Sequence, residues 1–207
     1  MSNVTIIGAG NMAGAIAGIA TKSGANVQIV ARDAVKAAAL AATTGATAAA
    51  YGDALTGDIV VLAVPYPAVD SIIATYANAL NGAIVVDITN PLDFSTFDSL
   101  VTPADSSAAA VIAEALPGAK VVKAFNTTFA ATLATGNVGS VETTVLVAGD
   151  DADAKQAVID LVTGGGVGAI DAGALKRARE LEALGFLQLT LAVGEKIPWT
   201  GGFALTR

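Results

Sequence analysis

A glycine-rich loop close to residue 1 constrains the fold of this chain more than any other feature. The apolar run 4–7 leads directly into the stretch GAGNMAG at 8–14, where a helical pattern begins. In dinucleotide-binding folds, a glycine at the position of Gly8 lets the strand turn sharply, and one at Gly10 lets the backbone approach a pyrophosphate. A small residue, here Ala13, lets the helix pack close to the sheet, and the pyrophosphate binds the positive helix end. A lone GxGxxG pattern is weak evidence, so the position of this one between an apolar strand and a helix is what favours a dinucleotide site over an ordinary turn.

The rest of the chain alternates short β-rich runs with alanine-rich helical stretches. The run 59–64 is apolar throughout, as strands are when both faces are buried. The sequence predicts an α/β fold: a Rossmann-type, doubly wound, mostly parallel sheet with a small C-terminal α/β extension that ends in a long helix over 175–193. Other expected helices cover 12–23, 34–43, 65 or 67 to 79, 106–116 and 152–162 (capped by Asp150), and expected strands cover 4–7, 27–31, 46–50, 58–64, 83–88, 120–124, 143–148 and 167–170. We expect a dinucleotide-binding domain over 1–124 and a small part over 125–207 that covers a second site.

Composition narrows the classes of function. Hydrophobic residues make up 54% of the chain and charged residues 14%, which excludes a disordered chain and suggests that a second copy covers apolar surface, as in a homodimer. The net charge of −7 argues against a nucleic-acid partner. There is no histidine and no cysteine, which excludes histidine-dependent hydrolysis, histidine-ligated metal sites and thiol chemistry, and we expect no metal. We find no signal peptide and no apolar stretch of about 18 residues, so we expect a cytoplasmic protein that does not bind a membrane.

Basic residues follow the second predicted strand. Arg32 comes directly after Ala31, and Lys36 lies four residues further on, so both cations can face one phosphate. NAD enzymes usually place an acid here for the ribose 2′-hydroxyl, whereas NADP enzymes place an arginine near the 2′-phosphate. The pair favours NADP(H), while Asp33 keeps NAD open, and solvated loop charges are the structural alternative.

Loops at the ends of three further strands hold polar and rigid residues. Ligands of open α/β sheets bind at the carboxyl ends of the strands, where prolines would fix loops beside the nicotinamide and Asn90 could bind its carboxamide. Next to Phe125, a polar trio suits a planar heterocycle. Plain turn and helix-cap chemistry explains the same residues about equally well. The candidates are Ala63, Val64, Pro65, Asn90, Pro91, Asn126, Thr127 and Thr128.

Four stretches together resemble the NADP-dependent deazaflavin (coenzyme F420) reductase family, over nearly the whole chain. They are GAGNMAG at 8–14, the pair Arg32 and Lys36, the run 106–110 leading to 121–127, and IDAGAL at 170–175. The resemblance implies an N-terminal Rossmann domain, a small C-terminal part that closes over the second cofactor, and direct hydride transfer between nicotinamide and deazaflavin. No protonating side chain is then essential, so we expect no catalytic residue; stacking and proximity of two rings can supply the catalysis.

The resemblance also implies site residues. One group of these residues would contact NADP(H). A second group would contact coenzyme F420, with FMN or FAD as the alternative ring. Ala31 stands where members of the family often have Ser or Thr, and Asn126 where some have His. The implied contacts are Gly8, Gly10, Asn11, Met12, Arg32, Lys36, Val64 and Pro65 on the NADP(H) side, and Asn126, Thr127, Leu184 and Leu187 on the side of the second ring.

Three other functions stay open. The stretch 10–12 followed by 15–16 also resembles pyrroline-5-carboxylate-reductase-like imine reductases, although the C-terminal helical region here is short for that family. A flavin or ferric reductase would keep the same fold, because the cytoplasmic domain of membrane ferric reductases is similar. A non-catalytic NADP(H)-binding redox sensor would use the first site alone.

Overall fold

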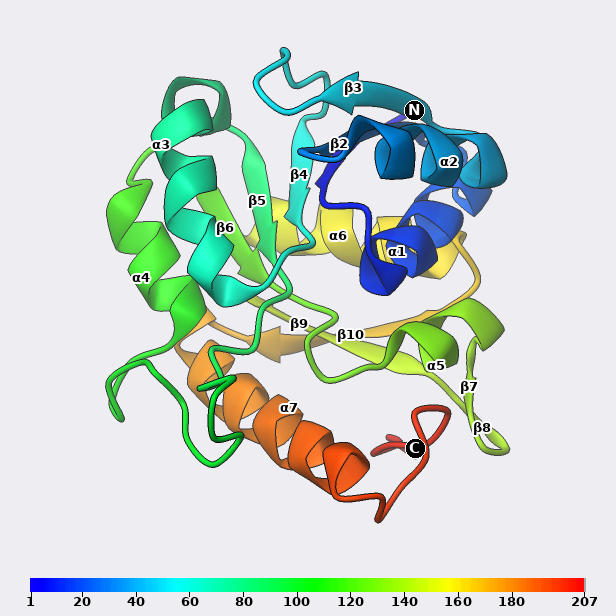
Figure 1. The fold of residues 1–207 in the computed structure, drawn as a ribbon, viewed down its shortest axis with the longest axis vertical. Coiled ribbons are helices and arrows are strands. Elements are labelled where there is room, and N and C mark those ends of the chain that lie inside the picture. The colour runs from blue at the N-terminus through cyan, green and yellow to red at the C-terminus, as the bar shows by residue number, and fades with distance from the viewer. Residues whose placement is uncertain (207) are drawn as a thin grey trace.

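The computed structural model describes residues 1–206, and it confirms the predicted α/β fold. Eight strands form one sheet in the order β10-β9-β6-β5-β4-β1-β2-β3 (Figure 1). Neighbouring strands from β3 to β6 are parallel, whereas β9 is antiparallel to β6 and parallel to β10. The carboxyl ends of six strands therefore meet at one edge of the sheet, where the predicted site residues follow them.

The helices and strands have well-defined bounds. The sheet contains β1 (Asn3–Ile7), β2 (Asn26–Ala31), β3 (Thr47–Ala50), β4 (Ile59–Leu62), β5 (Ile84–Asp87), β6 (Lys120–Lys123), β9 (Thr144–Gly149) and β10 (Gly168–Gly173), and a small ladder pairs β7 (Asn137–Val138) with β8 (Val141–Glu142). The α-helices are α1 (Asn11–Lys22), α2 (Ala34–Thr44), α3 (Val69–Leu80), α4 (Ala108–Ala115), α5 (Ala130–Thr135), α6 (Ala152–Gly164) and α7 (Ala178–Val193).

Helices cover both faces of the sheet, and each face has its own hydrophobic core. The core on one face is built with α1, α2, α5 and α6, and the core on the other face with α3, α4 and the start of α7. Alternate residues of one strand enter opposite cores, as Ile6 and Ile7 of β1 do. Burial on both faces explains why the central strands are apolar without alternation.

Most predicted elements are confirmed, with shifted ends. β4 ends at Leu62 rather than 64, and a 3-10 turn at Tyr66–Ala68 precedes α3. The predicted cap of α6 is wrong: the Asp151 carboxylate accepts the N–H of Ala154 at 2.8 Å, while Asp150 accepts the N–H of Leu175 at 2.9 Å. Asp150 and Asp151 are consecutive and carry the same side chain, so either could cap the helix. The residue at which the helix begins determines which of them is the cap.

The C-terminal part of the chain is continuous with the sheet. β9 and β10 come from residues after 124 and extend the same sheet beyond β6. The long helix α7 then packs against α4 and lies along one side of the molecule (Figure 1). Among residues 1–206, no helix has the length and apolar character needed to cross a membrane.

Candidate functional site

Two glycines of the loop between β1 and α1 have different roles. Gly8 has a φ of +130°, and a Cβ there would overlap the carbonyl oxygen of Ala63, so the fold itself requires glycine. Gly10 has an extended backbone, with a φ of −90°, and a Cβ there would meet nothing within 4 Å. Because the fold does not require glycine at Gly10, the open space beside it suits a ligand that approaches the backbone.

The first turn of α1 leaves backbone N–H groups available. Gly10 is the N-cap residue and provides no side-chain acceptor, and the first turn holds no acidic side chain. The first N–H groups of a helix have no partner within the helix, and the helix dipole makes this end positive. The start of α1 therefore suits an anion such as a pyrophosphate.

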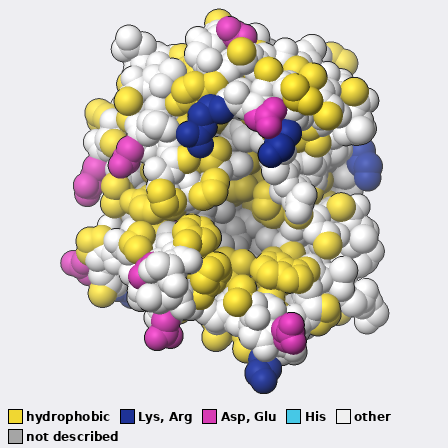
Figure 2. All heavy atoms as spheres, in the orientation of Figure 1, with side chains coloured by type: hydrophobic (Ala, Val, Ile, Leu, Met, Phe, Trp, Pro, Cys, Tyr) yellow, Lys and Arg dark blue, Asp and Glu magenta, His cyan; other side chains and the backbone are white. Residues whose placement is uncertain are grey.

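A first cavity of about 320 Å³ opens beside this loop, between the ends of β1, β2 and β4. Figure 2 shows the same face of the molecule hollowed at its centre, with basic side chains above the hollow and hydrophobic side chains around it. The cavity collects eight of the residues expected on the NADP(H) side, namely Gly8, Gly10, Ala31, Arg32, Lys36, Ala63, Val64 and Pro65.

The charges at the rim of this cavity are arranged around the start of α2. The Asp33 carboxylate caps the helix by accepting the N–H groups of Val35 and Lys36, each at 3.1 Å. Lys36 Nζ lies 3.7 Å from the same carboxylate. Arg32 is exposed and forms no ion pair within residues 1–206. The cap uses the acid at this rim and leaves the guanidinium of Arg32 available to an anion.

A second cavity of about 350 Å³ lies on the other side of the loop. Asn11 and Met12 of α1 line it, so both cavities adjoin the segment 10–12. Asn126 and Thr128, expected beside the second ring, also line it. Asn90, expected with Asn11 and Met12 on the NADP(H) side, lines this second cavity and not the first. Its other walls were not among the predicted site residues, and they are mostly apolar: Ile88, Phe125, Phe129, Ala130, Ala131, Leu189 and Trp199.

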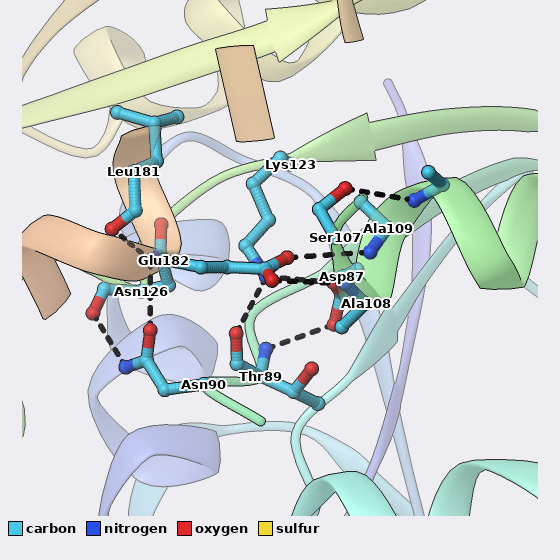
Figure 3. Close-up of polar contacts among 11 residues, drawn as sticks. Asp87, Thr89, Asn90, Ser107, Ala108, Ala109, Lys123, Asn126, Leu181 and Glu182 are labelled. Atoms are coloured by element: carbon cyan, nitrogen blue, oxygen red, sulfur yellow. Dashed lines mark hydrogen bonds and ion pairs between the residues drawn. The ribbon is translucent and has the colours of Figure 1, made fainter. Parts of the chain in front are cut away.

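Two asparagines at the edge of the second cavity hold each other (Figure 3). Asn90 Nδ2 donates to the backbone oxygen of Asn126 at 2.9 Å, and Asn126 Nδ2 donates to Asn90 Oδ1 at 2.9 Å and to the backbone oxygen of Leu181 at 2.8 Å. Gly185 of α7 leaves room for this pair, because a Cβ there would overlap Asn90 Oδ1. Phe125, just before Asn126, has a φ of 63°, and such conformations cluster at functional sites.

A buried ionic cluster lies next to the asparagine pair (Figure 3). Lys123 Nζ donates to Asp87 at 2.7 Å, to Glu182 at 2.8 Å and to the backbone oxygen of Thr89, and all three charged side chains are at most 1% exposed. Glu182 also accepts the N–H group of Ala108 at 2.8 Å, at the start of α4. The cluster joins β5, β6, α4 and α7, and through Thr89 it holds the loop that carries Asn90.

The ionisation of two groups near this cluster is shifted. Burial raises the pKa of the Glu182 carboxyl, while the charge of Lys123 and hydrogen bonds from Lys123 and Ala108 act in the opposite direction. Burial, followed by the charge of Asp70, raises the pKa of the Tyr66 phenol. Tyr66 therefore stays neutral at physiological pH.

Three residues expected beside the second ring, and Pro91, expected to bind the substrate next to the nicotinamide, lie outside the second cavity. Pro91 is buried, and Leu187 is 50% exposed on the outer face of α7. Thr127 and Leu184 line a separate cavity of about 90 Å³ together with Phe203. α7 instead contributes Leu189, and the tail after it contributes Trp199. The position of the single tryptophan of the chain was the only sequence feature that could have pointed to the tail.

Comparisons with known proteins identify similar sequences and folds. The family described as NADP oxidoreductase, coenzyme F420-dependent, matches residues 3–91. The F420-dependent NADP reductase of Methanocaldococcus jannaschii is 38% identical over 149 residues, which are 70% of this chain and 66% of that protein. The rat metalloreductase STEAP3 is 29% identical over 195 residues, which are 94% of this chain and 38% of that protein. The chain thus spans just under two thirds of the archaeal relative and well under half of the rat one.

A solved structure extends the similarity over the whole fold. The structure from Arthrobacter sp. FB24, provisionally named an F420-dependent NADP reductase, superposes with a TM-score of 0.87 and 28% sequence identity. The superposition covers 100% of both chains. The match therefore includes α7 and the tail, which the family match over 3–91 does not reach.

Proposed function

This chain belongs to the family of coenzyme F420-dependent NADP oxidoreductases, and on that premise we propose that it transfers a hydride between NADP(H) and the deazaflavin coenzyme F420. The observation that carries the proposal is the pair of cavities that adjoin the segment 10–12. A dinucleotide in the first cavity and a planar ring in the second would meet at this segment. Direct hydride transfer requires only that two rings are held in contact and aligned.

The first cavity fits NADP(H). The open space at Gly10 and the uncapped start of α1 suit the pyrophosphate. Arg32 and Lys36 suit the 2′-phosphate, because an arginine binds phosphate with charge-assisted hydrogen bonds. Val64 and Pro65 border the same cavity at the end of β4, where the nicotinamide end of the dinucleotide would pass toward the second cavity.

The second cavity fits a planar, largely apolar ring with polar edges. Its walls are aromatic and aliphatic, and its polar groups are amides and one hydroxyl, from Asn11, Asn90, Asn126 and Thr128. When bound, the deazaflavin supplies the ring atom that accepts or gives up the hydride. The protein contributes position: the hydrogen bonds between the asparagines fix one edge of the cavity, and Gly185 gives this pair its place against α7.

No ionisable side chain lines the second cavity among residues 1–206. A reaction that needs a protonating group at the reacting atoms would have no donor in this wall. Hydride transfer between two rings needs none, so the composition of the wall supports this reaction class over chemistry that depends on an acid or base. Catalysis would then come from orientation and from the exclusion of water.

The state and place of the protein in the cell are further proposals. We propose a homodimer, because Leu187 and Val193 of α7 are 50% and 47% exposed, and exposed apolar side chains on one helix suit an interface between copies. Light scattering after size exclusion would test it, and a mass of one chain at micromolar concentration would contradict it.

The cytoplasmic location expected from the sequence stays a prediction that cell fractionation would test.

A flavin is the second candidate for the partner ring. The alignment with the rat metalloreductase runs over nearly the whole of this chain, and FMN or FAD would present a ring of similar shape. We would follow the absorbance of NADPH in parallel cuvettes with coenzyme F420, FMN, FAD and pyrroline-5-carboxylate. Rapid NADPH-dependent bleaching of the deazaflavin is expected. Turnover with a flavin alone would support the second candidate, turnover with the imine alone would contradict both, and binding of NADPH without any turnover would favour a sensor.

A further inference from the structure

The tail after α7 forms one wall of the second cavity. The chain turns back at Glu195, which has a φ of 57°, and the N–H of Lys196 donates to the backbone oxygen of Leu191 at 2.8 Å. The turn brings Trp199 to the cavity, next to Phe129 at the start of α5. Residues distant in sequence thereby close a space that the loops after β5 and β6 leave open.

A buried glutamine holds this tail in place. Gln188 of α7 is 2% exposed; its Oε1 accepts the N–H of Phe203 at 2.8 Å, and its Nε2 donates to the backbone oxygen of Thr127 at 3.1 Å. Gly202 has a φ of 136°, and a Cβ there would lie only 2.7 Å from Gln188 Oε1. One side chain thus ties the tail to the loop after β6, and the backbone at Gly202 is shaped to allow the contact.

The tryptophan of the tail has one aromatic neighbour and a large uncovered surface. The rings of Trp199 and Phe129 are 4.9 Å apart between centroids, with an interplanar angle of 56°. Phe129 is 7% exposed, whereas Trp199 is 52% exposed. Both side chains line the second cavity, so the uncovered part of the indole lies beside space that is large enough for a ring.

From this geometry we infer that Trp199 is a specificity-determining residue that stacks against the planar ring bound in the second cavity, with Gln188 as the residue that positions it. The inference rests on the proposed function, because it names the contact that recognises the second ring of that reaction. Stacking against an aromatic side chain favours flat, extended ring systems of any substitution and does little for small aliphatic imines. The tail would therefore select a deazaflavin or flavin over a small imine at the same site.

Trp199 offers a direct spectroscopic test, because it is the only tryptophan of the chain. We would titrate the wild-type protein, saturated with NADP⁺, with oxidised coenzyme F420 and separately with FMN, and follow tryptophan fluorescence and the heat of binding. Stacking predicts saturable quenching with the same Kd as the heat. A ring that binds by calorimetry and leaves the tryptophan emission unchanged would overturn the inference while the proposed function stands.

Variants separate stacking from a loss of structure. Trp199→Ala is expected to raise the Kd of the bound ring about tenfold and leave the Kd of NADPH unchanged, and Trp199→Phe to restore most of the affinity. Gln188→Met keeps the tryptophan but frees the tail, so it should weaken ring binding and quenching together. Phe94→Ala is the matched control, because Phe94 is a half-exposed aromatic residue that lines neither cavity.

The outcomes distinguish the two proposals. Unchanged ring affinity in Trp199→Ala, or equal losses in Phe94→Ala, would overturn the role of Trp199 even if NADPH still reduces coenzyme F420. Binding of neither ring to the wild-type protein would overturn the proposed function, and the inference with it. Binding of FMN but not coenzyme F420, with quenching, would support the role of Trp199 and replace the deazaflavin by a flavin.

Discussion

The substitution Lys123→Met tests the buried cluster that supports the candidate site. Lys123 is the one cation between Asp87 and Glu182, and it also donates to the backbone oxygen of Thr89. Methionine keeps most of the length and apolar volume of the lysine side chain, so the change removes the ammonium group and leaves little cavity. Two carboxylates would then share one buried space without a counter-ion.

The structure sets the size of the expected effect. Lys123, Asp87 and Glu182 are all at most 1% exposed, so water does not replace the lost ammonium. Removing one partner of a buried ion pair costs about 3–5 kcal/mol of unfolding free energy. For a chain of this size, each kcal/mol lowers Tm by roughly 2–4 °C. We therefore expect Tm to fall by about 6–20 °C at pH 7, and by less at pH 5, where Glu182 takes up a proton more readily because burial raises its pKa.

The same strand provides a matched control. Lys120 forms an ion pair with Asp151 at 3.1 Å, but the two side chains are 45% and 34% exposed, and exposed pairs contribute only about 0–1 kcal/mol. We would measure thermal and urea unfolding of Lys123→Met and Lys120→Met by circular dichroism at both pH values. If the two variants unfolded at the same temperature, the buried cluster would not stabilise the fold and the reasoning would be refuted.

Three other substitutions test the site and its electrostatics. Arg32→Ala should weaken NADPH binding by about 1–3 kcal/mol and leave NADH binding unchanged; calorimetry with both cofactors would check it, and equal losses would exclude a contact with the 2′-phosphate. Gly10→Val should abolish dinucleotide binding without a loss of Tm, because the fold leaves this position open; unchanged NADPH affinity would show that the space is not a binding site. Burial raises the pKa of Glu182 above its usual 4.5, so the stability gained from its proton is fully present below pH 4.5 and is lost as pH rises through the folded pKa. The unfolding free energy should therefore fall less steeply over this window in Glu182→Gln than in the wild type, and equal slopes would contradict the shift.

The parts of the fold that depend on local sequence could be predicted. The strand, loop and helix at the start of the chain lie in one continuous segment, and their pattern indicated the first cavity because Gly8, Arg32 and Ala63 follow neighbouring parallel strands. The alternation of strands and helices predicted the sheet in the same way. Only fine choices in these elements failed, such as the cap of α6, which was predicted at Asp150 and lies at Asp151, where neighbouring residues offer equivalent chemistry.

The second cavity depends on contacts between distant residues, and the sequence does not specify these. Lys120 and Lys123 stand three residues apart in one short strand, yet only Lys123 is buried, because Glu182 reaches it from 59 residues further along the chain. The sequence also does not show which side of α7 faces the second cavity. Apolar residues occur on most of its surface, so the sequence could not decide that Leu189, and not Leu187, would line the cavity.

The two cavities differ in how much of their lining falls within the family match. The family match over residues 3–91 contains every residue of the first cavity, but only four of those that line the second: Asn11, Met12, Ile88 and Asn90. The first cavity therefore carries what the chain shares with a family of NADP oxidoreductases. On the proposed role of Trp199, selection of the second ring would fall mainly to segments outside that match, the start of α5 and the tail. On the proposed function, a change of partner ring within this fold could be made largely in those segments, because they leave the dinucleotide site as it is.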